Sequence, residues 1–355
     1  MTIQEIIIEA KKRKASDVHV VCGLPVRIRV HGLLENFDEN VLSHEDCERY
    51  VQEITEHKVV DEHDFAILIE DIRCRINIFR QQGHLSMAIR LLNDNIPELE
   101  SLGLPAEISR FTEFNRGIVI VTGETGSGKS TTLAALLNKI NKEDAVHIIT
   151  LEDPIEYVYK PQKALINQRE VGSDTKSFES GMEAILREDP DIILIGEMRS
   201  QATIEAALTA AETGHLVFAT LHTNSCADTI DRIVEIFPAE KQKQIRRQLS
   251  MTLDGVICQQ LIPNREGNGR VLAYELMFVN GAIRNLIREG KTPQISSTIS
   301  ITAEQGNITM DRCLIKLAMA NKISVKKAIE CAVDKEYVIS ELNYTEGKPS
   351  DMIFF

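Results

Sequence analysis

Residues 123–130 read Gly-Glu-Thr-Gly-Ser-Gly-Lys-Ser and decide the fold of most of the chain. They match the pattern GxxxxGK[ST], a glycine-rich loop whose backbone amides wrap around phosphate groups. The apolar stretch Gly117–Val121 precedes the loop and predicts a buried strand, and Thr131–Ile140 follows it and predicts a helix. A strand, a loop and a helix in this order form the context in which the pattern binds phosphate. The sequence therefore predicts a nucleotide-binding domain.

The loop and the start of the following helix supply the predicted nucleotide contacts. These are Gly123, Thr125, Gly126, Ser127, Gly128, Lys129, Ser130 and Thr131. We expect the Lys129 ammonium to reach the β- and γ-phosphates of ATP, and the Ser130 hydroxyl to bind Mg²⁺. The pattern is strong for nucleotide binding, but alone it does not say what the nucleotide drives.

Continuous apolar stretches after the loop predict a parallel sheet covered by helices on both faces. The expected strands are Ala145–Asp153, Asp191–Glu197 and His215–His222. The expected helices are Ser177–Arg187, Ala202–Glu212 and Ala239–Cys258. In the last of these, Ile245, Leu249, Leu253 and Ile257 recur every four residues and predict one stripe that faces the core. Residues 281–330 are expected to be mainly helical.

Three groups of polar residues follow predicted strands, where open α/β sheets bind their ligands. The first is Thr150–Glu156 (TLEDPIE), whose carboxylates could activate a water molecule or could form a solvated acidic loop. The second is Glu197, an acid at the end of an apolar strand, which is the Walker B pattern of a Mg²⁺-binding acid or an ordinary strand exit. The third is His222, which could contact a γ-phosphate, although a lone histidine here is more often a core residue.

The first part of the chain differs in pattern. Residues 18–34 and 65–92 predict short strands around a polar helix at 44–58. The second of these stretches contains four arginines, Arg73, Arg75, Arg80 and Arg90. They are either surface charges or cations that reach the phosphates of the nucleotide. We predict an N-terminal domain at 1–93, a linker at 94–105 and a second domain at 106–355, with 281–355 mainly helical.

Composition limits the other function classes. Lys plus Arg number 40 and Asp plus Glu 53, a net charge of −13, and Trp is absent, so direct nucleic-acid binding is disfavoured. The seven cysteines form no CxxC pair, which favours reduced, buried thiols over a zinc site. No apolar stretch is long enough to span a membrane. Thr2 and Glu5 form a predicted capping box for an amphipathic first helix, so we expect no signal peptide.

Taken together, the motifs resemble those of the secretion-type ATPases of type II secretion and type IV pilus systems. The resemblance covers nearly the whole chain and is strongest for pilus retraction ATPases. The motifs that carry it are Ser16–His19 (SDVH), Thr150–Glu156 (TLEDPIE), Asn167–Val171 (NQREV), Ile195–Met198 (IGEM), Ala211–Asn224 (AETGHLVFATLHTN) and Ala282–Glu289 (AIRNLIRE). The last of these also reads as an amphipathic helix with an apolar face at Ala282, Ile283, Leu286 and Ile287 and an end at Gly290.

The resemblance implies a role for each matching residue. Glu156 would be the catalytic glutamate that polarises water, and Glu197 the Walker B acid near Mg²⁺. His222 would sense the γ-phosphate. Arg75 and Arg90 would act as arginine fingers.

The resemblance also implies an architecture and partners. The expected fold is an α/β chain with a PAS-like N-terminal domain and a RecA-like P-loop ATPase domain that ends in a helical part. The expected assembly is a homo-hexamer that binds ATP between the two domains. Such a ring would be cytoplasmic and would meet the cytoplasmic membrane through an inner-membrane platform protein (PilC-like). It would power pilin disassembly and twitching motility.

The sequence departs from the family pattern at two residues and in the C-terminal tail. Glu124 stands where proline is common, Ser200 where aspartate is usual, and the C-terminal tail diverges.

A pilus extension or type II secretion ATPase usually carries a tetracysteine zinc module, which this sequence lacks. A nucleotide-gated scaffold with little turnover is disfavoured by the presence of both Glu156 and Glu197. A nucleic-acid translocase is disfavoured by the charge of −13.

Overall fold

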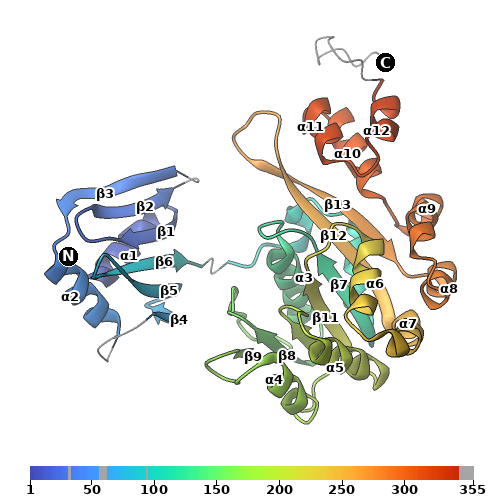
Figure 1. Ribbon diagram of the computed structural model, residues 1–355, viewed down its shortest axis with the longest axis horizontal. Coiled ribbons are helices and arrows are strands. Elements are labelled where there is room, and N and C mark those ends of the chain that lie inside the picture. The colour runs from blue at the N-terminus through green and yellow to red at the C-terminus, as the bar shows by residue number, and fades with distance from the viewer. Residues whose placement is uncertain (31–32, 56–61, 93–94, 344–355) are drawn as a thin grey trace. The chain divides into compact units, whose positions relative to one another are not determined.

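The computed structural model describes the chain except for residues 31–32, 56–61, 93–94 and 344–355 (Figure 1). The described residues form two compact units, one within residues 1–95 together with Glu156–Val158, and one within residues 96–155 and 159–355. The predicted linker begins at residue 94, which lies outside the described residues. Its later part contains the 3₁₀ helix η1 (Leu99–Leu102), and η2 (Ala106–Glu113) follows it. The domain limits given above stay a prediction.

The N-terminal unit is a six-stranded antiparallel sheet with two helices. The strands, in the order β3-β2-β1-β6-β5-β4, are β1 (Ala15–Val20), β2 (Pro25–Val30), β3 (Leu33–Val41), β4 (His63–Ile69), β5 (Ile72–Gln81) and β6 (His84–Leu91). The helices are α1 (Ile3–Lys12) and α2 (His44–Ile54). The Thr2–Glu5 capping box is present at the start of α1, as predicted. The end of the helix predicted at 44–58 lies partly outside the described residues.

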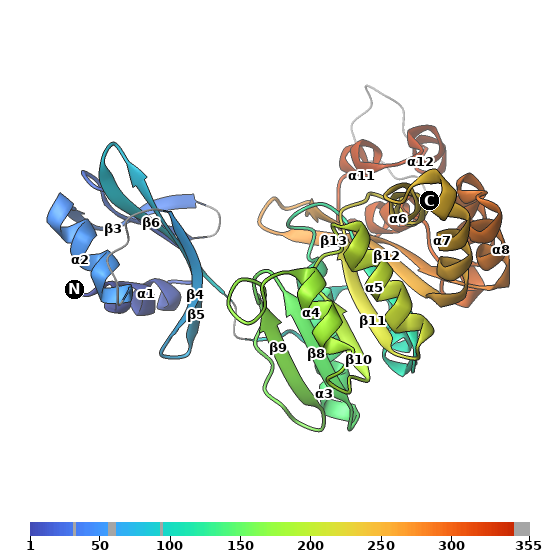
Figure 2. The same cartoon turned by 60° about the horizontal axis from the view of Figure 1, so that its bottom comes forward.

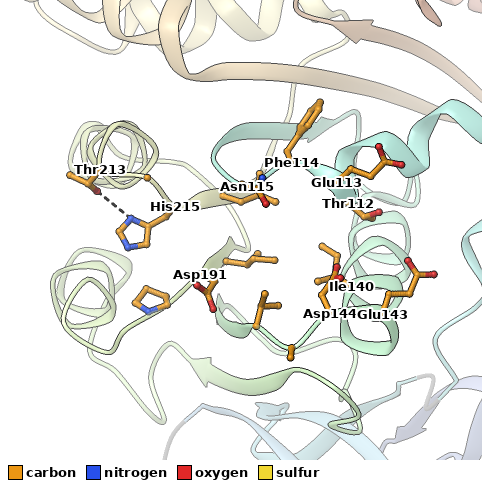
Figure 3. A pocket seen from close by; sticks show the side chains of 16 residues that line it. Thr112, Glu113, Phe114, Asn115, Ile140, Glu143, Asp144, Asp191, Thr213 and His215 are labelled. Carbon is orange, nitrogen blue, oxygen red and sulfur yellow. Dashed lines mark hydrogen bonds between the residues drawn. The ribbon is translucent and has the colours of Figure 1, made fainter.

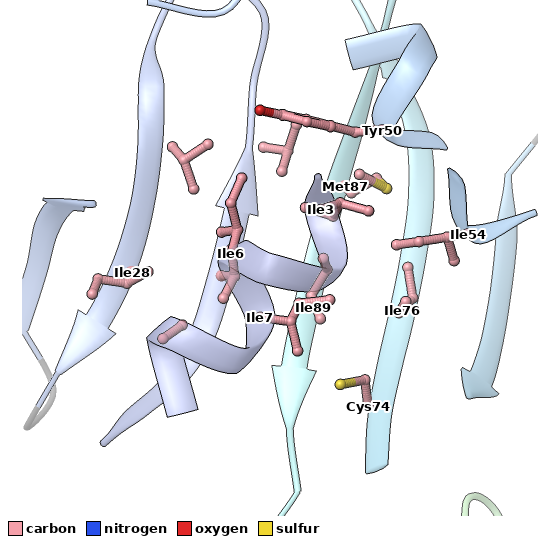
Figure 4. Packing of buried hydrophobic residues seen from close by; sticks show 14 of the residues in the cluster. Ile3, Ile6, Ile7, Ile28, Tyr50, Ile54, Cys74, Ile76, Met87 and Ile89 are labelled. Carbon is pink, nitrogen blue, oxygen red and sulfur yellow. The ribbon is translucent and has the colours of Figure 1, made fainter. Parts of the chain in front are cut away.

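Both helices cover the same face of this sheet (Figure 4). Ile3, Ile6 and Ile7 of α1 and Tyr50 and Ile54 of α2 pack against the strands. The sheet contributes fully or almost fully buried side chains, among them Ile28, Cys74, Ile76, Met87 and Ile89. Because side chains alternate along a strand, the residues between these buried positions lie on the face without helices.

The second unit is built on a seven-stranded sheet in the order β13-β12-β7-β11-β10-β8-β9. Its strands are β7 (Gly117–Thr122), β8 (His147–Glu152), β9 (Leu165–Glu170), β10 (Ile192–Ile195), β11 (Leu216–Leu221), β12 (Leu253–Pro263) and β13 (Arg270–Phe278). All neighbours run parallel except β12 and β13. Every residue of β7, β10 and β11 is buried, as the continuous apolar stretches predict.

Helices cover both faces of this sheet (Figure 2). They are α3 (Lys129–Glu143), α4 (Phe178–Ile185), α5 (Gln201–Glu212), α6 (Cys226–Glu235) and α7 (Ala239–Thr252). The helices α4, α5, α7 and α6 contact one another in that order, while α3 packs with η1 and η2. Right-handed crossovers place α3 on one face and the other four helices on the opposite face.

The helix predicted at Ala239–Cys258 is too long. The helix α7 ends at Thr252, and Leu253 begins the strand β12, which pairs with β7 and β13. Leu253 and Ile257 are four residues apart, and this spacing puts two residues on one face of a strand as well as on one face of a helix. The β-branched stretch beyond Gly255 therefore joined the sheet, where its backbone groups are paired on both sides.

A helical region ends the described chain, as predicted. It contains α8 (Gly281–Glu289), η3 (Thr292–Gln294), α9 (Ile295–Ile301), η4 (Ala303–Gln305), α10 (Met310–Met319), α11 (Val325–Cys331) and α12 (Lys335–Glu341). Gly290 ends α8 in the left-handed conformation at φ +70°, as predicted. Of the apolar face expected for this helix, Ile283 and Ile287 are buried, whereas Ala282 is exposed. The divergent tail lies largely outside the described residues.

All seven cysteines are free thiols, and five of them are buried. Within the described part of the chain, no helix is long and apolar enough to cross a bilayer.

Candidate active site

The site predicted from sequence lies at one edge of the seven-stranded sheet. Because β7, β8, β10 and β11 are parallel neighbours, their carboxyl ends share that edge. The phosphate loop follows β7, Glu152 ends β8, Glu197 follows β10 and His222 follows β11. This is the edge where open α/β sheets bind their ligands.

The phosphate loop requires glycine at three positions. Gly123, Gly126 and Gly128 have φ values of +136°, +81° and +93°. A Cβ on Gly123 would lie 2.3 Å from the backbone oxygen of Gln259 and 2.7 Å from Ser127 Oγ. Any side chain at this position would therefore push the loop away from β12. Gly128 is also the residue before the first turn of α3, which leaves the helix N-terminus open toward the loop.

Lys129 and Ser127 show that the loop fits phosphate oxygens. Lys129 is only 8% exposed, and its Nζ donates to the backbone oxygens of Gly123 at 2.8 Å and Glu124 at 2.9 Å. The buried Ser127 hydroxyl has no hydrogen-bond partner among the described residues. An unpaired buried hydroxyl costs about 1–3 kcal/mol, and a phosphate oxygen would remove that cost. Glu124 itself is exposed and adds only its backbone oxygen to these contacts.

Glu197 is held between two basic side chains. Arg199 Nη2 lies 2.6 Å from Glu197 Oε2, and His222 Nε2 lies 3.3 Å from Glu197 Oε1. Burial alone would raise the pKa of Glu197, but Arg199, followed by His222, outweighs it and holds the pKa below its usual value. The carboxylate is therefore ionised at neutral pH and can act as an oxygen ligand for Mg²⁺. Ser130, the other expected Mg²⁺ ligand, lies at the same edge at the start of α3.

Threonines lock the ends of the neighbouring strands together. The backbone N–H of Thr223 donates to Thr122 Oγ1 at 2.8 Å, and Thr223 Oγ1 lies 2.7 Å from Thr229 Oγ1 in α6. The hydroxyl of Thr220 donates to the backbone oxygen of Gly196. The residue after His222 is thus joined to the last residue before the phosphate loop.

The carboxylates of the stretch 150–156 have different surroundings. Glu152 Oε1 accepts from Thr150 Oγ1 at 2.6 Å and from Gln168 Nε2 at 3.2 Å. Glu156 is exposed and has no hydrogen bond or ion pair to another described residue. An exposed carboxylate without a partner can turn toward a bound water, whereas Glu152 is already occupied. The catalytic role of Glu156 stays a prediction.

The predicted arginine fingers are neighbours in the N-terminal unit. Arg75 of β5 and Arg90 of β6 stand directly opposite each other in the strand register, on the face without helices. Arg75 forms an ion pair of 2.7 Å with Asp64, and Arg90 one of 3.4 Å with Asp17. Two like charges in register repel each other unless acids compensate them. Asp64 and Asp17 supply this compensation, and the role of the two arginines at the phosphates stays a prediction.

Sequence reasoning missed Arg199 and Gln259 and left Ser200 unexplained. Gln259 Nε2 donates to Thr132 Oγ1 of α3 at 2.8 Å, which fixes β12 beneath the phosphate loop. The available signal was a glutamine within the apolar stretch Val256–Ile262. Ser200 accepts from the backbone N–H of Thr203 and caps α5, and aspartate can cap a helix in the same way.

A cavity of about 610 Å³ lies at the opposite edge of the sheet (Figure 3). Its lining residues come from just before β7, β8, β10 and β11 and from the end of α3. They include Glu113, Glu143, Asp144, Asp191 and His215. None of the residues predicted from sequence to act on nucleotide lines this cavity.

Comparisons with known proteins agree with this arrangement. Residues 1–311 match the family model described as type II/IV secretion system protein. The type IV pilus retraction ATPase PilT of Pseudomonas aeruginosa is 44% identical over 339 residues, which are 94% of this chain and 98% of that protein. A twitching motility protein of Neisseria gonorrhoeae is 43% identical and covers 87% of this chain and 84% of its own length.

A solved structure extends the likeness to the fold. The crystal structure of the pilus retraction motor PilT with bound ADP superposes with a TM-score of 0.87 at 44% identity. The match covers 95% of this chain and 98% of that one. It confirms the predicted fold class of an α/β N-terminal domain followed by a RecA-like ATPase domain. From the family match and the full-length identity, we conclude that the chain belongs to the type II/IV secretion system protein family.

Proposed function

We propose that this chain is an ATP-hydrolysing motor that powers the retraction of type IV pili. The observation that carries the proposal is the 44% identity to a pilus retraction ATPase over 94% of the chain. The geometry supports it, because a glycine-rich loop, a buried lysine, an ionised carboxylate and a histidine share one edge of the sheet. Force on a pilus needs repeated nucleotide turnover, which these groups can provide.

The phosphate loop binds ATP. The amides around Gly126 and Gly128 and the N-terminus of α3 attract the phosphates, and Lys129 leaves the two backbone oxygens to pair with them. Ser127 gains the partner that it lacks. Ser130 and Glu197 would hold Mg²⁺, which supplies positive charge at the β- and γ-phosphates. Thr125 and Thr131 complete the predicted contacts.

Hydrolysis requires a group that orients the attacking water. We assign this role to Glu156, whose carboxylate is exposed and unengaged by other described residues. His222, paired with Glu197, changes its contacts when the γ-phosphate leaves. Arg75 and Arg90 add the cations that stabilise the charge of the transition state.

The proposed assembly is a homo-hexamer that works against an inner-membrane platform protein (PilC-like). The chain would then be cytoplasmic and would reach the cytoplasmic membrane only through that partner. The product of the work is pilin disassembly, which moves the cell by twitching.

The test combines ATP turnover with oligomer mass measured by light scattering, for the wild type and for Glu156→Gln. We expect wild-type turnover to rise as the mass approaches that of a hexamer. Glu156→Gln should still bind ATP, while turnover falls about 10²- to 10⁴-fold, the usual contribution of a positioned general base. A wild-type chain that stays monomeric and inactive at every concentration would indicate a scaffold instead.

A further inference from the structure

A buried carboxylate that the proposed reaction does not use lies on β13. Glu275 is 4% exposed. Its Oε1 accepts from the backbone N–H of Cys226 at 2.7 Å, and its Oε2 accepts from the backbone N–H of Met310 at 3.3 Å. Cys226 is the first residue of α6 and Met310 the first residue of α10. One carboxylate therefore accepts from the first residues of two helices that begin 84 residues apart in the chain.

A buried negative charge such as that of Glu275 is costly unless positive groups compensate it. Burial raises the pKa of Glu275 although the two amides oppose the shift. No lysine, arginine or histidine pairs with it among the described residues, so the positive ends of the two helices are its counter-charges. A hydrophobic residue would fill this strand position at lower cost. The carboxylate thus has a specific use, which is to hold both helix ends at once.

The first of these helices is joined to the nucleotide site. The loop 222–225, which begins with His222, runs directly into α6. Thr223 contacts Thr229 of α6 at 2.7 Å and Thr122 before the phosphate loop at 2.8 Å. The position of α6 therefore follows the position of the loop that contains His222.

The second helix belongs to the C-terminal helical region. The helix α10 packs against β13, α11 and α12. A second tie joins α6 to the same region, because Thr292 Oγ1 donates to both carboxylate oxygens of Asp231 at 2.8 Å. Hydrogen-bonded and packed groups thus connect Thr122, the loop 222–225, α6 and α10 without a break.

We propose that Glu275 is a positioning residue that couples the loop of His222 to α10, so that nucleotide binding changes the C-terminal helical region. The inference rests on the proposed function, because it needs the nucleotide at the phosphate loop. The two oxygens of Glu275 are rigidly joined, so if the carboxylate moves with α6, its hydrogen bond to α10 must move as well. A displacement of α6 is therefore shared with α10.

The test uses Glu275→Gln in the full chain. The glutamine keeps the size of the side chain, but only its carbonyl oxygen can accept a hydrogen bond, so one helix end loses its partner. Hydrogen–deuterium exchange of residues 310–341 is measured with and without ADP, together with kcat and KM for ATP. In the wild type, we expect ADP to change the exchange of α10. In the variant, that change should disappear, kcat should fall about tenfold and KM should stay within about twofold.

Asp311→Asn is the matched control. Asp311 is also buried, and its carboxylate accepts from the backbone N–H groups of Val333 and Asp334 at 2.7 and 3.0 Å. It holds the turn before α12 within the C-terminal region, and among the described residues no hydrogen bond joins it to α6. The control should loosen α12 but keep the response of α10 to ADP and the wild-type kcat.

A second variant keeps the test decisive if Glu275→Gln does not fold. Thr229→Val retains the shape of the side chain and removes the contact between the loop and α6, so it should also abolish the response of α10. A response that persists in either folded variant would overturn the coupling. A wild type that binds ADP without any change in α10 would overturn it as well. A wild type that binds no ADP would overturn the proposed function, and the coupling with it.

Discussion

The two edges of the seven-stranded sheet differ sharply although the same strands make both. At the carboxyl ends of β7, β10 and β11 lie Lys129, Glu197 and His222, all with specific partners. At the amino ends of the same strands lies the cavity of about 610 Å³, where carboxylates such as Glu113 and Asp144 are exposed. The direction of the strands decides which loops and helix ends lie at each edge.

The difference shows that this fold attracts anions at one edge of the sheet and repels them at the other. At the carboxyl edge, a helix N-terminus and a glycine-rich loop supply unpaired N–H groups, which attract anions. At the amino edge, helices end and their free carbonyl groups repel anions. Phosphate chemistry is therefore expected at one edge only, and substitutions at matched positions can test this.

The largest expected effect follows from Lys129→Ala. Without the ammonium, the phosphate loop loses a buried cation that contacts its backbone oxygens, so ATP binding and turnover should fall at least about 10³-fold. Nucleotide affinity is measured by calorimetry and turnover by phosphate release. Unchanged affinity and turnover would remove the phosphate site from this edge.

Lys142→Ala is its control at the other edge. Lys142 lies near the far end of the same helix α3 and forms an exposed ion pair with Glu98. Such pairs contribute little to stability, so affinity and turnover should stay close to wild type. Equal losses of turnover in both variants would mean that any lost lysine in α3 has this effect, whichever edge of the sheet the lysine lies at.

Much of this comparison was predictable from the sequence, because its signals are local. The phosphate loop, the acid at 197 and the apolar strands each lie within a few consecutive residues. The end of α7 was not predictable in this way, since the spacing of Leu253 and Ile257 suits both a helix and a strand. Glu275 was missed for a different reason. Its partners Cys226 and Met310 are 49 and 35 residues away, so only the folded chain brings them together.

A smaller effect on ATP turnover is expected from Arg75→Ala and Arg90→Ala. These variants test whether the groups at the carboxyl edge can hydrolyse ATP without the two arginines. That edge holds the carboxylates Glu152, which ends β8, and Glu197, which follows β10, so a transition state with more negative charge needs further cations. Each variant should lower turnover about 10- to 10³-fold in assembled protein, with ATP affinity nearly unchanged.

Arg29→Ala is the control for the two arginines. Arg29 also pairs with Asp17, at 3.6 Å, and lies in β2 of the same sheet, which β1 separates from β6. Its loss should leave turnover near that of the wild type. If all three variants behave alike, the surface has a general electrostatic effect. If Arg75→Ala and Arg90→Ala both hydrolyse ATP normally, the cations come from elsewhere.

The smallest expected effect is that of Glu113→Gln combined with Asp144→Asn at the amino edge. The six residues of β7 separate the two edges by about 20 Å, at about 3.3 Å per residue. Two unit charges at this distance in water interact by about 0.2 kcal/mol, and physiological salt, with a Debye length of about 8 Å, reduces this further. Turnover measured at low and at physiological salt should therefore stay within about twofold of wild type. A tenfold loss at both salt concentrations could not be electrostatic, and the cavity would then have to act through contacts that move with the ATP cycle.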